Sequence, residues 1–419
     1  MPTASKSDHY NLLYVREETI GGNKQLSPVS FQTLKLTSPP QQLVHDFQPS
    51  GQSCLYYRIT IAAEKPNFHV VVSTGSGTNQ AKDVWSKLVQ PMIAFVCDAA
   101  QQQAEVHFTE SEASIVDLTR NVFKPQADQG VKQAIVLLSG DGGLVDVINT
   151  LLEAPRGEHY QKPNVTIMPL GTGNALAHSA HITTDKTLGL STLFRGWPQE
   201  IPIFTAKFSP GARLLVNEAR EERELRTVNG TLTAYGAVVC SWGLHAGLVA
   251  DSDTAEYRKH GVDRFKMAAK EALYPSDGSL PHPYKGQLSI RRAGNGKWET
   301  VSRETHGYAL ATFCSQLEAG FTISPSSQPL DGRLRLVHFG HVSGDDAMQI
   351  MGKAYAGGGH VEDERVGYDE VEAVRIEFDE DDGRWRRICV DGKIIRVEKE
   401  GWVEVITGDV TGLVDLIAR

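Results

Sequence analysis

The sequence has no long run of apolar residues. No stretch approaches the roughly 18–20 apolar residues that a transmembrane helix needs, so we expect no transmembrane segment. The first residues, MPTASKSDHYNLLYV, lack the apolar core of a signal peptide, and Pro2 stands where N-myristoylation requires a glycine. These absences favour a cytoplasmic protein whose association with membranes is peripheral.

Cysteine and positive charge are also scarce. The five cysteines show neither CxxC spacing nor an even count, which favours reduced core thiols over a disulfide framework. The 42 Lys and Arg residues are outnumbered by 51 Asp and Glu residues, and the net charge is −9. Nucleic-acid binding depends mainly on neutralising phosphates with positive charge, so we expect no nucleic-acid partner.

The 419 residues are too many for one ordinary hydrophobic core, so we expect more than one domain. The pattern of predicted helices and strands changes along the chain accordingly. Residues 1–66 are rich in Ser, Gln and Pro and predict a short β-rich N-terminal appendage. Residues 67–200 alternate strands with helices, which predicts an α/β domain with a parallel sheet. Residues 201–419 predict an antiparallel β domain of short strands, one of them over 232–240, interrupted by a charged, partly helical stretch at 241–273.

Three strands of the predicted α/β domain end in glycine turns that lead into helices. These turns are STGSG (73–77), SGDGG (139–143) and GTGN (171–174). The carboxyl ends of parallel strands meet at one edge of the sheet, where open α/β proteins bind their ligands. Free backbone N–H groups and the helix dipole make such junctions phosphate sites, so the sequence predicts a phosphate-binding edge.

Asp141 is the unexpected member of these turns. A carboxylate placed where phosphate should bind repels the phosphate, unless it binds a metal ion or accepts a proton. An acidic residue in a solvated turn is the alternative interpretation when this loop is considered alone.

The three turns and the 241–273 stretch together resemble the lipid-kinase family of diacylglycerol, sphingosine and ceramide kinases. The resemblance covers roughly residues 67–400 and is strongest at SGDGG (139–143), PLGTGNALA (169–177) and SWG…DSD…YRKHGVDRFKMA (241–268). It implies a nucleotide-binding α/β domain of NAD-kinase-like topology followed by an antiparallel β-sandwich domain, with the active site between them. It also implies use of ATP and Mg²⁺ and a lipid substrate met at a membrane surface.

The resemblance implies roles for individual residues. Asp141 matches the base that takes the proton of the lipid hydroxyl, and Asp251, with Asp253 as an alternative, matches the acid that contacts the lipid head group. Arg258 and Arg264 match arginines that meet ATP phosphates, whereas without the motif a solvated helix face with pairing to acidic neighbours would be the favoured interpretation. The complete set of predicted nucleotide-binding residues is Ser73, Thr74, Gly75, Ser76, Gly77, Thr109, Ser139, Gly140, Gly142, Gly143, Asp146, Gly171, Thr172, Gly173, Asn174, Arg258, Arg264, Asp391 and Gly392.

Three departures from the family pattern affect these expectations. The first loop, 73–77, replaces the usual Asn-Pro-x-x-Gly, and Asp146 stands where sphingosine kinases carry Glu. The late Asp-Gly-Glu motif reads Asp391-Gly392-Lys393, so that a base replaces an acid.

The favoured function is an ATP-dependent lipid kinase acting on a sphingoid base, whose ammonium group the DSD acids (251–253) could meet. A diacylglycerol or ceramide kinase is the alternative among enzymes. A catalytically lapsed lipid-binding or regulatory protein is the alternative of another class. The sequence leaves the oligomeric state and the role of residues 1–66 open.

Overall fold

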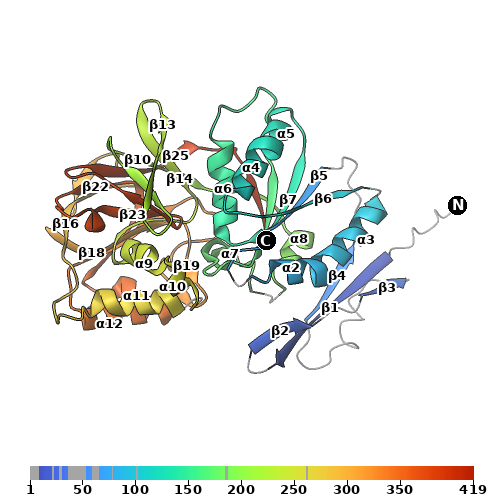
Figure 1. The fold of residues 1–419 in the computed structure, drawn as a ribbon, viewed down its shortest axis with the longest axis horizontal. Coiled ribbons are helices and arrows are strands. Elements are labelled where there is room, and N and C mark those ends of the chain that lie inside the picture. The colour runs from blue at the N-terminus through green and yellow to red at the C-terminus, as the bar shows by residue number, and fades with distance from the viewer. Residues whose placement is uncertain are drawn as a thin grey trace.

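The computed structural model contains an α/β half, a larger β half and a small N-terminal sheet (Figure 1). It describes four N-terminal strands and then residues 66–419 apart from 78, 101, 185–186 and 261–262. The N-terminal strands pair antiparallel around the longest of them, so this segment is β-rich as predicted. They are β1 (His9–Ile20), β2 (Asn23–Ser27), β3 (Phe31–Lys35) and β4 (Ser53–Arg58).

The α/β half is built on four parallel strands in the order β6-β5-β7-β8. Their bounds are β5 (Asn67–Val72), β6 (Ala104–Phe108), β7 (Gln133–Ser139) and β8 (Asn164–Pro169). β5, β7 and β8 are almost fully buried, because helices pack on both faces of the sheet. The predicted parallel α/β domain is therefore confirmed.

The helices of this half divide between the two faces of the sheet. Side chains of α2, α3 and α8 pack on one face, and those of α4, α6 and α7 on the other. Two π-helical turns, η2 (Trp85–Val89) and η3 (Thr119–Phe123), join neighbouring helices. The helices are α2 (Ala81–Val84), α3 (Gln90–Ala100), α4 (Ser114–Leu118), α5 (Lys124–Asp128), α6 (Asp141–Leu151), α7 (Ala175–Ser179) and α8 (Leu190–Arg195).

The end of the chain returns to the α/β half. β26 (Asp415–Ala418) pairs parallel with β8 and antiparallel with β9 (Trp197–Glu200), which completes a six-stranded sheet. Figure 1 shows the C-terminus beside α7 and α8. The sequence pattern assigned residues 415–418 to the β domain, whereas the structure pairs them with strands of the α/β half. The domain boundary near residue 200 stays a proposal.

The β half is one antiparallel sheet of 14 strands, which confirms the predicted antiparallel domain. Its strands are β10 (Ile203–Phe208), β11 (Arg213–Val216), β12 (Glu221–Glu224), β13 (Arg226–Val228), β14 (Thr231–Gly236), β15 (Val239–Gly243), β16 (Tyr284–Arg292), β17 (Trp298–Thr300), β18 (Thr305–Thr312), β21 (Leu334–Gly340), β22 (Val366–Phe378), β23 (Arg387–Val390), β24 (Lys393–Arg396) and β25 (Trp402–Val410). A separate pair, β19 (Gln316–Glu318) and β20 (Phe321–Thr322), lies beside α7.

Four α-helices lie in the described part of the β half. The stretch predicted to become helical folds as α9 (Leu244–Ser252), α10 (Ala255–Arg258) and α11 (Asp263–Leu273). The fourth helix is α12 (Gly344–Tyr355). Among the described residues, no helix has the length and apolar character needed to cross a membrane.

One of the hydrophobic clusters spans both halves of the molecule. A single cluster of buried side chains runs from β7, β8 and α6 into β14, β15 and β18. Asn149 of α6 reinforces this contact: its side chain donates to the carbonyl of Tyr235 at 2.9 Å and accepts from the N–H of Tyr235 at 3.2 Å. In Figure 1, α6 stands on the side of the α/β half that faces the β half. The helix that follows the Asp141 turn is therefore fixed to both halves.

Candidate active site

The three glycine loops meet at the carboxyl edge of the parallel strands. The hydroxyl of Ser76 in the first loop accepts a hydrogen bond from the N–H of Gly140 in the second, at 3.2 Å. A Cβ built on Gly140 would lie 2.7 Å from the Cα of Gly171 in the third loop. A Cβ on Gly77 would lie 2.2 Å from the carbonyl oxygen of Leu170. Glycine is required at these positions because the loop backbones touch.

The third loop is held by its own side chain and contacts the β half. Asn174 adopts a left-handed conformation (φ 54°), and its Oδ1 accepts from the N–H of Gly171 at 2.9 Å. A Cβ on Gly173 would lie 3.3 Å from the carbonyl oxygen of Leu317 next to this loop. The expected site thus lies where the two halves of the molecule meet.

Asp141 is the first residue of α6 and reaches the start of α7. Its Oδ2 accepts from the N–H of Leu176 at 3.1 Å. Burial raises the pKa of the carboxyl group to about 6, against the opposing effect of the backbone N–H groups of Leu176, Ala175 and Ala177. A carboxylate with a pKa near neutrality is suited to accept a proton from a substrate hydroxyl.

The second oxygen of Asp141 is available to a cation. Oδ1 is buried and has no hydrogen-bond partner among the described residues. A buried carboxylate oxygen without a donor is the kind of ligand that Mg²⁺ takes from proteins. The residues of this loop therefore fit the magnesium ion that the family resemblance implies.

Asp391 brings a second carboxyl group from the β half. Its oxygens accept from the N–H groups of Ala237 and Val239, both at 2.6 Å, and of Val238 at 3.0 Å. Burial raises its pKa to about 6, those N–H groups oppose the rise, and the charge of Asp141 adds to it. A buried carboxyl group whose pKa is raised further by a neighbouring carboxylate marks a place where a cation or a proton is favoured.

These bonds also correct the strand predicted over 232–240. The structure has two strands there, β14 and β15, separated by Ala237 and Val238. The strand is interrupted at this point because the N–H groups of Ala237 and Val238 donate to the Asp391 carboxylate rather than to a neighbouring strand. Asp391 therefore positions backbone in the structure, and its predicted contact with the nucleotide stays a prediction.

Comparison with known proteins agrees with this geometry. The family model for the diacylglycerol kinase catalytic domain matches residues 67–206, which include all three glycine loops. Residues 67–206 are thus similar to the diacylglycerol kinase catalytic domain.

Curated proteins similar to this chain include several sphingosine kinases. Human sphingosine kinase 1 is 25% identical over 54% of this chain and 52% of its own length. Mouse sphingosine kinase 1 is 24% identical over 73% of this chain and 74% of its own length. Sphingosine kinase 2 of Arabidopsis thaliana is 29% identical over 49% and 37%. The chain thus spans about half the length of the human relative and a larger share of the mouse protein.

The solved structures support the fold. A putative diacylglycerol kinase from Bacillus anthracis str. Sterne superimposes with a TM-score of 0.57 at 14% identity, over 86% of this chain and 98% of that one. A second structure from the same organism gives a TM-score of 0.53 at 13% identity, over 85% and 99%. At these identities the likeness concerns the arrangement of the two halves, not their chemistry.

Two of the departures from the lipid-kinase pattern prove to be partners. Asp146 lies on α6 and Lys393 begins β24, and the lysine Nζ lies 2.8 Å from the aspartate Oδ1. The ion pair joins the α/β half to the β half beside the Asp391 turn. The sequence presented these residues as separate anomalies because they are far apart along the chain.

The first glycine loop (73–77), which departs from the family pattern, is held by hydrogen bonds to Thr109. The N–H of Thr74 donates to the hydroxyl of Thr109 at 2.9 Å, and the hydroxyl of Thr74 donates to the carbonyl of Thr109 at 2.8 Å. Thr109 is buried and directly follows β6. Two residues predicted to contact nucleotide therefore hold each other, and the Thr74 N–H is not open to a phosphate.

The acids predicted to face the lipid head group are paired with arginines. Asp251 lies 3.0 Å from Nη2 of Arg384 and 2.8 Å from Nη1 of Arg387, two residues that the sequence did not single out. Asp253 lies 3.3 Å from Nη1 of Arg264, the arginine expected to meet ATP phosphate. The head-group and phosphate roles of these residues stay predictions.

Arg258 can be placed only by its backbone. It is the last residue of α10, and its side chain lies outside the described part of the chain. The cysteines with described side chains agree with the expectation of core residues: Cys97, Cys240, Cys314 and Cys389 are all buried.

Proposed function

We propose that this protein transfers the γ-phosphate of ATP to the hydroxyl group of a lipid, with a sphingoid base as the favoured acceptor. The observation that carries the proposal is Asp141, a buried carboxyl group with a pKa of about 6 where three glycine loops converge. The curated relatives support the choice of acceptor, because those described above are sphingosine kinases.

The proposed reaction uses Asp141 as the base. The acceptor hydroxyl oxygen forms a bond to the γ-phosphorus, the bond from that phosphorus to the β,γ-bridging oxygen breaks, and ADP leaves. The hydroxyl proton passes to the Asp141 carboxylate, whose raised pKa makes it basic enough to hold the proton. The backbone N–H groups of the loops orient the phosphates, since phosphoryl transfer depends mainly on positioning and charge neutralisation. Mg²⁺ bound with ATP near Asp141 would supply further neutralisation of phosphate charge.

Asp253 is the better candidate for the ammonium group of a sphingoid base. The Asp253 side chain is 45% exposed, whereas that of Asp251 is 33% exposed and lies between Arg384 and Arg387. The Asp253 carboxylate is therefore the more accessible of the two to an ammonium group from solvent. Diacylglycerol and ceramide carry no ammonium group, so this contact separates the candidate lipids.

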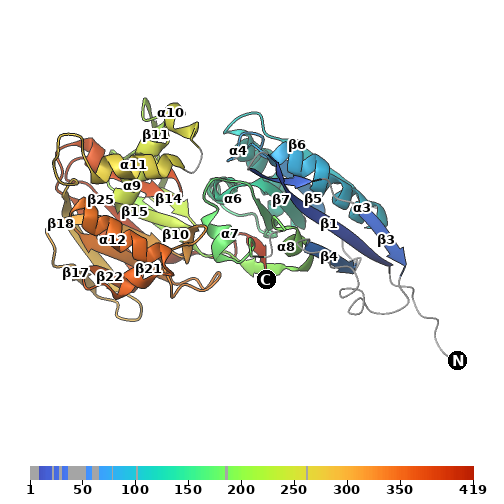
Figure 2. The same cartoon turned by 90° about the horizontal axis from the view of Figure 1, so that it is seen from below.

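We also propose that the β half meets the membrane through α11 and α12. Figure 2 shows both helices on the β half. The end of α11 meets the start of α12, where the Tyr274 hydroxyl lies 2.9 Å from Oδ1 of Asp345. Met267 on α11 is 39% exposed, and Met348 on α12 is 50% exposed. Exposed large apolar side chains on adjacent helices suit shallow contact with a lipid surface.

One assay tests the activity and the acceptor together. The full chain is incubated with radiolabelled ATP, Mg²⁺ and, in separate reactions, vesicles containing sphingosine, ceramide or diacylglycerol. We expect label in sphingosine, loss of labelling in Asp141→Asn, and a raised KM for sphingosine in Asp253→Asn. Label in diacylglycerol or ceramide instead would overturn the sphingoid assignment.

The same assay addresses the alternative of a catalytically lapsed protein. Lys393, a base in place of the family's acid, is the observation that favours this alternative. Sedimentation with sphingosine-containing vesicles but transfer to none of the three lipids would support it and overturn the kinase proposal. Glu substitution of Met267 and Met348 should reduce sedimentation if α11 and α12 form the membrane contact.

A further inference from the structure

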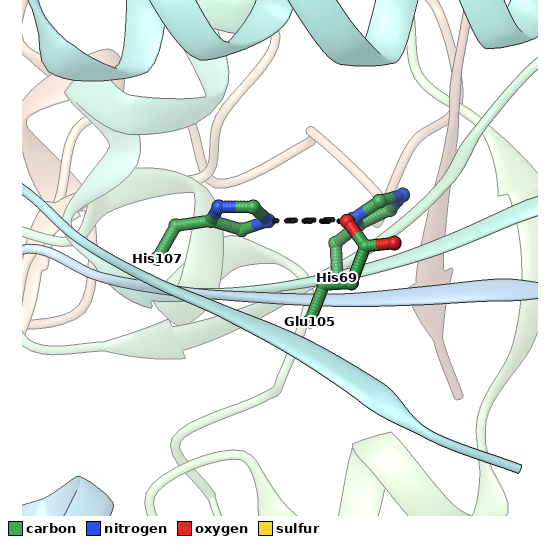
Figure 3. A group of neighbouring side chains, drawn as sticks. All are labelled: His69, Glu105 and His107. Carbon is green, nitrogen blue, oxygen red and sulfur yellow. Dashed lines mark hydrogen bonds and ion pairs between the residues drawn. The ribbon is translucent and has the colours of Figure 1, made fainter.

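Three side chains outside the candidate active site point toward one another across β5 and β6 (Figure 3). His69 of β5 lies opposite Glu105 of β6, and His107 follows two residues later on the same face of β6. Nδ1 of His69 lies 3.4 Å from Oε2 of Glu105 and 3.4 Å from Nε2 of His107. Nε2 of His107 lies 3.9 Å from Oε2 of Glu105.

These separations fit the ligands of one transition-metal ion. A zinc ion binds imidazole nitrogen and carboxylate oxygen at about 2.0–2.2 Å in tetrahedral geometry. Two such ligands of one ion are then roughly 3.3–3.6 Å apart, by the tetrahedral angle and those bond lengths. Two of the three separations already have this value, and the exposed Glu105 side chain can close the third by a small rotation.

A second contact orients the buried histidine for such a role. Nε2 of His69 lies 3.1 Å from Oε1 of Gln126, which also accepts from Nδ2 of Asn67 at 3.1 Å. An amide oxygen only accepts, so Nε2 carries the hydrogen and Nδ1 presents its lone pair toward the other two side chains. Metal-binding histidines are commonly oriented by a hydrogen bond of this kind from the other ring nitrogen. The ring is fully buried and packs against Phe123 at 5.1 Å.

We propose that His69, Glu105 and His107 bind one zinc-class divalent transition metal, with a fourth coordination position open to solvent on the side of Glu105. The exposed fraction of the Glu105 side chain is 60%, which gives the ion a route in. Two imidazole ligands favour Zn²⁺ over Mg²⁺, which prefers oxygen donors. This ion is therefore distinct from the magnesium expected with ATP.

The position of the site suggests what the ion does. His107 is two residues before Thr109, which is hydrogen-bonded to Thr74 in the first glycine loop. β6 is the edge strand of its sheet and is held there by β5 alone. A metal shared by β5 and β6 would tie this edge strand to the sheet and so support the loop that departs from the family pattern.

The test measures zinc binding directly and does not require kinase activity. The full chain, without an affinity histidine tag, is stripped with chelator and titrated with ZnCl₂ by calorimetry, with MgCl₂ as the comparison. We expect one zinc equivalent that Mg²⁺ does not displace, a raised unfolding temperature, and the visible spectrum of tetrahedral cobalt when Co²⁺ replaces Zn²⁺. His107→Ala and Glu105→Gln should each weaken binding at least tenfold and abolish that spectrum.

Matched controls come from the same half of the molecule. His159→Ala and Glu158→Gln alter exposed residues and should leave zinc binding unchanged. Zinc binding that is equal in His107→Ala and in the controls would place the ion elsewhere and overturn the proposal. Absence of zinc binding by a folded wild-type chain would also overturn it and would leave the histidines as a hydrogen-bonded pair. Neither result bears on Asp141, so failure of this proposal is distinguishable from failure of the kinase proposal.

Discussion

Replacing Asp141 with asparagine should make the protein more stable near neutral pH while abolishing lipid phosphorylation. Burial raises the pKa of this carboxyl group from 3.8 to about 6 in the folded state. Each pKa unit corresponds to about 1.36 kcal/mol, so keeping Asp141 ionised at neutral pH costs the folded state up to about 3 kcal/mol. Asparagine removes this cost and retains an oxygen that can accept from the N–H of Leu176.

The sign of the pH dependence follows from the direction of the pKa change. The folded protein takes up the Asp141 proton near pH 6, whereas the unfolded chain does so near 3.8. The contribution of protonated Asp141 to stability is therefore fully present below 3.8 and is lost as pH rises through about 6. The stability advantage of Asp141→Asn should be largest above this window and should disappear below it.

Urea unfolding of wild type and variant, at about pH 4 and about pH 7, measures this difference. Asp117→Asn, an exposed acid on α4 paired with Arg120, is the control and should show no comparable gain. The reasoning is refuted if Asp141→Asn is the less stable protein at pH 7, because the carboxylate would then stabilise the fold. Full lipid phosphorylation by a stable Asp141→Asn protein would remove Asp141 as the base.

Two further predictions concern the contacts that assemble the site. Gly140→Ala places a Cβ 2.7 Å from the Cα of Gly171, so we expect the free energy of unfolding in urea to fall by about 1–3 kcal/mol. Gly142→Ala is the control and should cost far less stability, because its Cβ would meet nothing within 4 Å. Equal losses of stability in the two variants would show that the loops do not touch. Reversing one charge of the Asp146–Lys393 pair should destabilise the protein, and exchanging both charges should recover about 0.5–1 kcal/mol, since the lysine side chain is 40% exposed. A double-mutant cycle at low and high salt measures this coupling, and additive effects would mean that the ion pair does not form in solution.

The sequence predicted the phosphate-binding edge because its signal is local. β5, β7 and β8 are buried on both faces, so their sequences are continuous apolar runs. Each strand is followed by a turn that contains glycine, because the backbones of these turns lie too close together for a Cβ. β26 gave no such signal. It has four residues, and its place in the sheet depends on pairing with β8, some 250 residues earlier, which no local pattern records.

The proposed metal site was invisible in the sequence for a similar reason. His69 and His107 belong to different strands, and Glu105 meets them only because β5 and β6 pair in one particular register. The break between β14 and β15 was missed because the group that causes it, the Asp391 carboxylate, lies more than 150 residues further along the chain. Contacts fixed by tertiary register thus account for these errors, whereas contacts within one strand and turn were predicted.

Helix α6 explains two of the departures from the lipid-kinase pattern, Asp146 and Lys393. Asp141, Asp146 and Asn149 all lie on α6, and each bonds to a different element: α7, β24 and β14. A substitution on α6 therefore alters contacts with the β half. Taken one position at a time, Asp146 is a shortened acid and Lys393 a reversed charge, and both suggest lost function. Taken as an ion pair, they preserve a link between the two halves of the molecule, so Lys393 by itself is weak support for a lapsed enzyme.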